Sequence, residues 1–349
     1  MTDPVTVAVD ANGADLGARE VAAGAAAAAE RGTRVLLFGP AAEIGSVPSG
    51  VEVVDAPVSI AKAADPALAV RSTPDASIVR AVKAVAAGEA DALVSGGSTG
   101  AAIAAGVFNI KRARGIYRPA LALPMPIPGA PILLLDVGAN LSARPEHLVQ
   151  FAFMGAAMSR AVLGVARPRV ALLSNGEEAS KGTDDVVAAH EQLAARAPTA
   201  GDLEFVGNVE GTQVTTGAAD VIVTDGFTGN IALKLLEGTS GTILGAVRDA
   251  ATSTPRAKLG GLLLRPALRR FRDEIDPEGP GGAYMLGLRR VGIVAHGRFT
   301  RNGFSQAIGV AERAVRERAV ERTQDLLESA GALRSAPVSE PAASLGSSR

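Results

Sequence analysis

The fold is decided by one segment in the second half of the chain, Val221-Ile222-Val223-Thr224-Asp225-Gly226-Phe227-Thr228-Gly229-Asn230. Its first four residues are β-branched, which is typical of a buried strand. A glycine-rich turn follows and leads directly into residues 228–250, where apolar residues recur at helical spacing. A strand, a tight turn and a helix in this order form part of a βαβ unit, so the segment predicts an α/β protein.

The same alternation runs outward from this segment in both directions. Short runs rich in β-branched residues or leucine predict strands over residues 5–10, 34–39, 51–56, 92–95, 120–125, 132–136, 169–174, 203–206 and 221–224. Longer, often alanine-rich runs between them predict helices over residues 19–31, 75–87, 99–113, 146–163, 183–197 and 228–250. This pattern predicts a mostly parallel sheet with helices on both faces, which is a three-layer α/β/α architecture.

Composition shows no break that would mark a domain boundary before the end of the chain. We therefore expect a single catalytic domain over residues 1–333 of the 349, and this length also allows two subdomains. Residues 334–349 are rich in serine, proline and alanine and lack apolar periodicity, so they predict a disordered tail.

Charge and cysteine content exclude several classes of function. The 35 basic and 36 acidic residues give a net charge of −1, which argues against a nucleic-acid partner. The chain has no cysteine, so disulfides, zinc–thiolate sites, iron–sulfur clusters and acyl-cysteine intermediates are excluded. Its first residues, Met1-Thr2-Asp3-Pro4, lack the basic segment of an export signal, so we expect a cytoplasmic protein.

Polar, glycine-rich loops follow five of the predicted strands. They comprise residues 10–15, 95–100, 136–140, 174–178 and 225–230. Because the carboxyl ends of parallel strands line one crevice, we expect these loops to converge on a single site. The alternative is that each glycine only permits a tight turn, and the number of such loops favours the site.

Two of these loops are candidates for binding an anion. Ser98, Thr99 and Thr228 stand just before or within the first turn of a predicted helix, where free backbone N–H groups and hydroxyls face an anion such as phosphate. No GxGxxG or GxxxxGK[ST] sequence is present, and no metal-ligand cluster is apparent, so we expect no nucleotide, metal or other cofactor. Lys181 places a cation beside the crevice, although a solvated surface lysine is the alternative.

The three histidines, by contrast, do not form a cluster in the sequence. His147 and His190 fall in predicted helices, and His296 falls in a turn next to glycine. We interpret each as structural, because no motif supports a Ser-His-Asp triad.

At these loops the chain resembles the bacterial acyl-acyl-carrier-protein phosphate acyltransferases (PlsX family). The resemblance covers about residues 5–330 and is most specific at residues 220–238. It extends to further short segments at residues 136–140, 176–178, 181–182, 281–283, 286–288 and 296–297. The chain departs from the family pattern at Asn12, Ala14, Ser98 and Ser174.

The resemblance implies a fold like those of isocitrate and isopropylmalate dehydrogenases and of phosphotransacetylases. It implies a homodimer that transfers a long-chain acyl group from acyl carrier protein to inorganic phosphate, giving acyl phosphate for phospholipid synthesis. Lys181 and Asn230 would then be catalytic. The phosphate would be held by Ser98, Thr99, Gly100, Thr228 and Gly229. The loops would be oriented by Asp10, Asp136, Asn140 and Asp225.

Residues 256–272 combine six basic residues with leucines and contain no acidic residue. This pattern predicts a helical hairpin at about residues 251–276, kinked near Pro266. We expect it to contact an anionic membrane transiently, or the acidic carrier protein, through Leu262, Leu263, Leu264, Arg265, Arg269 and Arg270. A partly buried helix beside a dimer interface is the alternative. The protein would then be cytoplasmic and peripherally associated with the membrane.

Three other functions remain compatible with the sequence. They are a short-chain phosphotransacylase, a metal- and nicotinamide-dependent decarboxylating dehydrogenase, and a catalytically silent protein that binds membrane surfaces. The basic, leucine-rich segment argues against a small soluble substrate. The dehydrogenase is disfavoured because no Asp or Glu occurs between Asp91 and Asp136 to hold a ribose.

Overall fold

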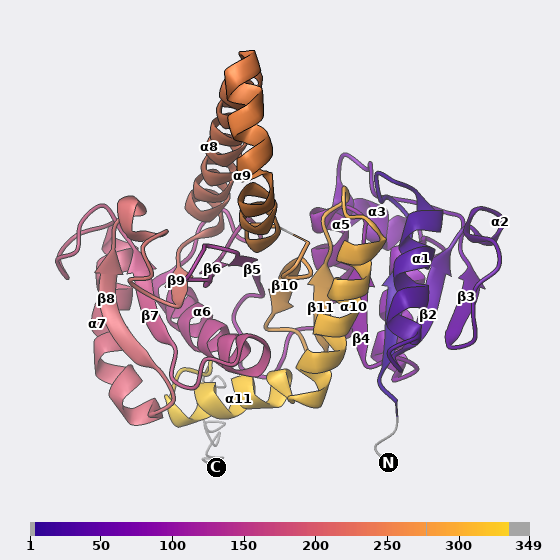
Figure 1. Ribbon diagram of the computed structural model, residues 1–349. Coiled ribbons are helices and arrows are strands. Elements are labelled where there is room, and N and C mark those ends of the chain that lie inside the picture. The colour runs from indigo at the N-terminus through magenta and orange to yellow at the C-terminus, as the bar shows by residue number, and fades with distance from the viewer. Residues whose placement is uncertain (1–3, 277, 335–349) are drawn as a thin grey trace, which may run out of the picture.

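One long sheet crosses the molecule from side to side (Figure 1). The computed structural model describes residues 4–276 and 278–334, and within them the sheet has 11 strands in the order β3-β2-β1-β4-β11-β10-β5-β6-β9-β7-β8. The strands are β1 (Thr6–Asp10), β2 (Arg34–Gly39), β3 (Val51–Asp55), β4 (Ala92–Ser95), β5 (Ala120–Met125), β6 (Ile132–Leu135), β7 (Arg169–Leu173), β8 (Glu204–Val209), β9 (Val221–Val223), β10 (Ala283–Leu286) and β11 (Val291–Val294).

Helices cover both faces of this sheet. They are α1 (Ala18–Ala29), α2 (Ala41–Ile44), α3 (Pro66–Ser72), α4 (Ser77–Ala87), α5 (Thr99–Ala105), α6 (Pro145–Met158), α7 (Asp184–Ala200), α8 (Gly226–Thr252), α9 (Pro255–Glu274), α10 (Arg301–Arg316) and α11 (Ala319–Ser329). Short π-helical turns extend α5 over Gly106–Ile110 and α6 over Ser159–Leu163.

The core consists of two apolar layers, one on each face of the sheet. Within β1, Val7 and Val9 belong to the layer that includes α1, α6 and α10, and Ala8 belongs to the layer that includes α4 and α5. Strands buried on both faces are expected when helices cover both sides of a sheet. The predicted three-layer α/β/α architecture is therefore confirmed.

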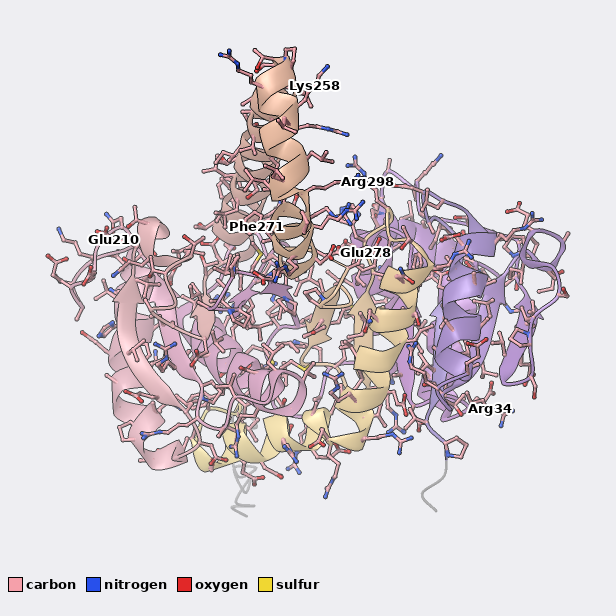
Figure 2. All side chains as sticks on the ribbon, viewed as in Figure 1. Arg34, Glu210, Lys258, Phe271, Glu278 and Arg298 are labelled. Atoms are coloured by element: carbon pink, nitrogen blue, oxygen red, sulfur yellow. The ribbon has the colours of Figure 1, made fainter. Side chains whose placement is uncertain are left out.

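The sheet changes direction at its centre. Strands β3, β2, β1, β4 and β11 run parallel to one another, and so do β6, β9, β7 and β8. Between these two halves, β10 and β5 make three antiparallel pairings, so the halves run in opposite senses. The twist of about 20–25° per strand accumulates across the sheet and turns the second half round. In Figure 2, Arg34 at the start of β2 lies low in the view, and Glu210, just after the end of β8, lies high. The carboxyl ends of strands in both halves therefore lie on the upper side of the molecule.

All nine predicted strands are present, with ends that differ by no more than a few residues. Two strands, β10 and β11, and the helices α2, α3, α10 and α11 were not predicted. Strands β10 and β11 have four residues each and are joined by a turn of only a few residues, with no helical segment between them, so they do not follow the strand–helix alternation on which the other predictions rest. Their strand state depends on hydrogen bonding to β5 and β4, which lie on either side of them.

Helices α8 and α9 form a hairpin that rises away from the sheet (Figure 1). The hairpin spans residues 226–274, so the predicted bounds of 251–276 were wrong, and the chain reverses at Ser253 and Thr254. Thr254 caps α9 by accepting a hydrogen bond from the N–H of Ala257, and Pro255 occupies the first turn of the helix. A capping threonine followed by proline is a strong start signal for a helix, whereas Pro266 is accommodated inside α9.

No helix in residues 4–276 and 278–334 combines the length and the apolar character needed to cross a membrane. The tail predicted at residues 334–349 lies outside the described residues, apart from Arg334. The backbone N–H of Arg334 donates to the carbonyl of Gly115 over 2.8 Å.

Candidate functional site

The loops after β1 and β4 are held together by a buried carboxylate, that of Asp10. Its side chain, which is 2% exposed, accepts hydrogen bonds from the hydroxyls of Ser77 (2.6 Å) and Ser95 (2.9 Å). Burial raises the pKa of Asp10 to about 6, because these hydrogen bonds only partly offset the loss of water. The hydroxyl of Ser95 also accepts the N–H of Gly97, so Asp10 sets the first turn of the 95–100 loop.

The rest of this loop offers free hydrogen-bond donors. Ser98 caps α5 by accepting the N–H of Ala101, but the N–H groups of Ser98, Thr99 and Gly100 have no partner among the described hydrogen bonds. Thr99 and Gly100 are exposed. A small cavity of about 10 Å³ adjoins the loop, and its lining combines the apolar residues Ile60, Ala61, Ile78 and Ala101 with the polar residues Asp10, Asn12, Ser59, Ser77, Ser95 and Ser98. The geometry here is therefore compatible with the predicted phosphate cradle.

A second buried carboxylate, Asp136, holds the loop after β6. One of its oxygens accepts N–H groups from Leu121 (3.1 Å), Gly138 (3.1 Å) and Ala139 (2.9 Å). The other accepts the backbone N–H (2.7 Å) and the side-chain amide (2.8 Å) of Asn140. Burial raises the pKa of Asp136 despite these five hydrogen bonds. Asp136 and Asn140 therefore orient this loop.

The start of α8 packs directly on this loop, and its backbone donors are all occupied. The N–H of Gly226 donates to the carbonyl of Asn140 (2.7 Å). Asp225 accepts the N–H groups of Phe227 and Thr228, the hydroxyl of Thr228 and, through its carbonyl, the N–H of Gly229. The expectation of free donors at residues 228–229 is therefore not met, because the capping carboxylate of Asp225 takes them.

Asn230 is the first residue of α8 with a polar side chain that takes part in no described hydrogen bond. It is exposed, and its amide has no partner among the described hydrogen bonds. Its side-chain carbons lie about 4.0 Å from the point that a Cβ on Gly138 would occupy. The amide of Asn230 therefore lies close to the loop that Asp136 holds.

Lys181 lies in the loop after β7. Its N–H donates to the carbonyl of Glu178 (2.9 Å), which also accepts the side-chain amide of Asn208 from the end of β8. Among the described ion pairs, none involves its ammonium group, which leaves it free to bind an anion. Because β7 and β9 are parallel neighbours, this loop leaves the sheet at the same edge as the start of α8. The topology thus brings the loops of Lys181 and Asn230 to one edge.

The described hydrogen bonds divide the five predicted loops into three groups. The first comprises the loops after β1 and β4, the second those after β6 and β9, and the third is the loop after β7, which is bound to Asn208 of β8. No described hydrogen bond joins the first group to the second, so the convergence of all five loops on a single site stays a prediction.

One loop of the first group was missed. Residues 295–298 follow β11, and the N–H of Ala295 donates to the carbonyl of Ser95 while the N–H of Asp15 donates to that of Gly297. The only signal in the sequence was the His296-Gly297 pair within the family resemblance. It could not be placed because β11 was not predicted.

Two of the three histidines have structural partners elsewhere. His147 Nδ1 accepts the N–H of Arg144 at the start of α6, and His190 Nδ1 forms a hydrogen bond with the side-chain oxygen of Asn208. Across residues 4–276 and 278–334, no group of three or more His, Asp or Glu side chains could hold a metal ion.

Comparison with known proteins assigns this arrangement to a family. A family model described as "Fatty acid synthesis protein" matches residues 5–322. The chain is 41% identical over 351 residues to the "Phosphate acyltransferase" of Anaeromyxobacter sp. (strain K), covering 97% of this chain and 95% of that one. The chain belongs to the phosphate acyltransferase family. It is also 41% identical over 318 residues to the "Phosphate acyltransferase" of Thermobifida fusca (strain YX), covering 89% of this chain and 88% of that one.

Solved structures with a similar fold include two phosphotransacetylases. The "EutD phosphotransacetylase from Staphylococcus aureus" aligns with a TM-score of 0.58 at 16% identity, covering 89% of this chain and 94% of that one. A phosphotransacetylase from Streptococcus pyogenes aligns with a TM-score of 0.58 at 18% identity, covering 90% and 95%. At such identities the likeness concerns the fold alone, and it confirms the predicted fold of this phosphate acyltransferase family member.

The contact between α8 and the Asp136 loop can be tested at Gly229. A Cβ at this position would lie 1.9 Å from the carbonyl oxygen of Asp136. We expect Gly229→Ala to lower the free energy of unfolding in urea by about 1–3 kcal/mol, because helix or loop must shift. Gly238→Ala in the same helix meets no atom within 4 Å and should leave stability equal or raise it by about 0.5–1 kcal/mol. Equal stabilities of the two variants would contradict the packing described here.

The buried state of Asp10 predicts a pH dependence of stability. Its pKa is raised from 3.8 to about 6 in the folded protein, so folding favours the protonated form. Its contribution is therefore fully present below about pH 4 and falls as the pH rises through 6. Relative to Asp10→Asn, the wild type should lose about 2–3 kcal/mol of stability between pH 4 and pH 7. Urea unfolding of both proteins at the two pH values measures this, and a constant difference would rule the effect out.

Proposed function

We propose that this protein transfers a long-chain acyl group from the thioester of acyl carrier protein to inorganic phosphate. An oxygen of phosphate attacks the thioester carbonyl carbon, the carbon–sulfur bond breaks, and the carrier leaves as a thiolate while acyl phosphate forms. Phosphate is a competent nucleophile near pH 7, and a thiol with a pKa of about 8.5 is a good leaving group. Direct transfer therefore needs no covalent enzyme intermediate, which fits a chain without cysteine.

One observation supports a carrier-bound, long-chain donor over a small soluble one. Membership of the phosphate acyltransferase family supports phosphate as the acceptor. The hairpin of α8 and α9 then adds a surface that a small substrate does not need, with Leu262, Leu263 and Leu264 exposed by 61%, 77% and 58%. Basic side chains flank these leucines, and α9 carries no acidic residue between Arg256 and Arg272. Apolar and cationic groups together suit an acyl chain with an anionic head, an acidic carrier or an anionic membrane.

The roles proposed for the site residues follow from their surroundings. The ammonium group of Lys181 neutralises the phosphate, and the free amide of Asn230 orients the phosphate or stabilises the oxyanion formed at the carbonyl. The N–H groups of Ser98, Thr99 and Gly100 form the cradle. Thr228 and Gly229 contribute through the capped start of α8, which positions Asn230. A homodimer, with the exposed apolar side chains of α8 at its interface, is part of the same proposal.

The reaction itself is tested by incubating the protein with labelled phosphate and either a long-chain acyl carrier protein or an acetyl thioester. We expect labelled acyl phosphate from the long-chain donor and little from the acetyl donor. Exclusive use of the acetyl donor would identify a short-chain phosphotransacylase, and no product from either donor would refute the proposal.

The catalytic assignment predicts that Lys181→Ala and Asn230→Ala each lower acyl phosphate formation by about 30- to 1000-fold. This range corresponds to a loss of roughly 2–4 kcal/mol when a transition-state charge or donor is removed. Lys234→Ala is the matched control, because the ammonium of Lys234 lies on α8 and pairs with Glu237 at 2.7 Å. Its rate should stay within about twofold of the wild type. Near-native rates in the Lys181 and Asn230 variants, with unchanged circular dichroism, would contradict the assignment.

The hairpin predicts transient binding to anionic membranes. Burying leucine side chains favours insertion by about 0.8 kcal/mol per methylene, and each nearby arginine adds about 1 kcal/mol at an anionic surface. We expect Leu262→Glu with Leu263→Glu to abolish sedimentation with phosphatidylglycerol vesicles while sparing turnover in solution. Val58→Glu with Leu68→Glu, at exposed sites outside the hairpin, should leave vesicle binding unchanged. Unchanged binding of the hairpin variant would refute docking, and lost turnover in solution would indicate a structural or carrier-binding role.

A further inference from the structure

The turn after β11, residues 295–301, adjoins the candidate phosphate loop although about 200 residues separate them in the chain. Strand β11 pairs with β4 in parallel, so both strands end at the same edge of the sheet. The N–H of Ala295 donates to the carbonyl of Ser95 over 2.9 Å, at the start of the 95–100 loop. The N–H of Asp15 donates to the carbonyl of Gly297 over 2.8 Å, which ties the turn to the loop after β1 as well.

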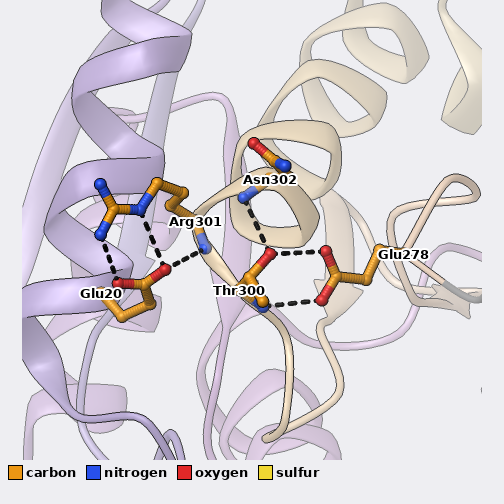
Figure 3. Close-up of polar contacts among 5 residues, drawn as sticks. All are labelled: Glu20, Glu278, Thr300, Arg301 and Asn302. Atoms are coloured by element: carbon orange, nitrogen blue, oxygen red, sulfur yellow. Dashed lines mark hydrogen bonds and ion pairs between the residues drawn. The ribbon is translucent and has the colours of Figure 1, made fainter.

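The end of this turn is held by two carboxylates from distant parts of the chain (Figure 3). Glu278 accepts the N–H (2.8 Å) and the hydroxyl (2.7 Å) of Thr300. Glu20 in α1 accepts the N–H of Arg301 (2.8 Å) and forms a bidentate ion pair with its guanidinium (3.1 and 3.0 Å). The hydroxyl of Thr300 also accepts the N–H of Asn302 and so caps α10. The backbone of the turn is therefore fixed at both ends.

Arg298 is the charged residue that this rigid turn presents without a partner. Its backbone N–H donates to His296 Nδ1 (3.2 Å), and the imidazole of His296 stacks on the buried ring of Phe299. Arg298 is exposed, and its guanidinium takes part in no described ion pair. Figure 2 shows Arg298 on the upper side of the molecule, between the hairpin and the half of the sheet that contains β1. The neighbouring carboxylates of Glu278 and Glu20 are already engaged.

We propose that Arg298 binds the inorganic phosphate that accepts the acyl group, an inference that rests on the proposed function. A guanidinium donates two parallel hydrogen bonds that match the oxygens of phosphate. The adjoining loop supplies three further donors, the unpartnered N–H groups of Ser98, Thr99 and Gly100. Because the turn is anchored before phosphate arrives, little backbone ordering opposes binding. Arg298 thus joins the 95–100 loop in holding the phosphate that Lys181 neutralises in the proposed function.

The experiment measures KM for phosphate and kcat in Arg298→Gln and in a matched control, Arg290→Gln. Arg290 is also exposed and immediately precedes β11, at the opposite end of the same strand. Loss of a charged hydrogen-bond donor to phosphate should raise KM for phosphate about 10- to 150-fold with kcat little changed. Arg298→Lys should recover part of this loss, because it keeps the charge without the planar fork. The control should match the wild type.

A second readout does not depend on turnover. Inorganic phosphate should raise the Tm of the wild type and of Arg290→Gln, and this rise should be lost in Arg298→Gln. A wild-type KM for phosphate in Arg298→Gln, or a phosphate-dependent Tm that persists in it, would overturn the inference. A raised KM for the acyl carrier protein alone would also overturn it, because Arg298 would then contact the carrier. If the wild type forms no acyl phosphate although phosphate raises its Tm through Arg298, the proposed function fails while the phosphate site stands.

Discussion

The candidate site depends on carboxylates that are buried where strands end. Asp136 is fully buried and accepts five hydrogen bonds, three of them from consecutive backbone N–H groups, at residues 138–140, that a tight loop would otherwise leave unpaired. Asp10 plays a similar part at the end of β1, with two serine hydroxyls as donors. Burial of a carboxylate is unfavourable without such donors, so the loops and the carboxylates stabilise each other. The positions of Asn230 and of residues 98–100 follow from these two anchors.

The reversal of the sheet explains how one chain presents loops from both halves on the same side. A parallel sheet without reversal would twist the carboxyl ends of its last strands away from those of its first. Here three antiparallel pairings invert the second half, and the accumulated twist then turns its carboxyl ends towards the side from which β1 and β4 emerge. Strands β10 and β11 are central to this arrangement. They complete the reversal and also carry the anchored turn that ends at Arg301.

Helix α8 connects the site to the hairpin. Its first turn packs on the Asp136 loop so closely that Gly226 and Gly229 have no space for a side chain. Its distal half carries exposed apolar residues and has no partner other than α9 among the described contacts. One continuous helix therefore begins at the candidate catalytic amide and ends at the surface proposed to meet a membrane or carrier. In the proposed reaction, the charged head of the acyl phosphate would lie at the site, where α8 begins. Its apolar chain would lie near the hairpin, where α8 ends.

Local patterns in the sequence were sufficient for much of this description. Runs rich in β-branched residues or leucine predicted nine of the 11 described strands, and glycine-rich segments after them marked the loops that Asp10, Asp136 and Asp225 hold. These features could be read because strand, turn and cap preferences act over a few residues. The hairpin was detected from its charge pattern, but its length was not, because the turn depends on Thr254 and Pro255 and not on Pro266.

Tertiary structure decided which segments, far apart in the chain, lie side by side. The sequence by itself determined an α/β fold, the polar loops and the family to which they belong. It did not determine the reversal at β10 and β5, the occupied donors at the start of α8, or the approach of residues 295–301 to residues 95–100. Each of these depends on hydrogen bonds between segments far apart in the chain. Such pairings leave no periodic trace in either segment alone, because their free energy arises only when both are brought together.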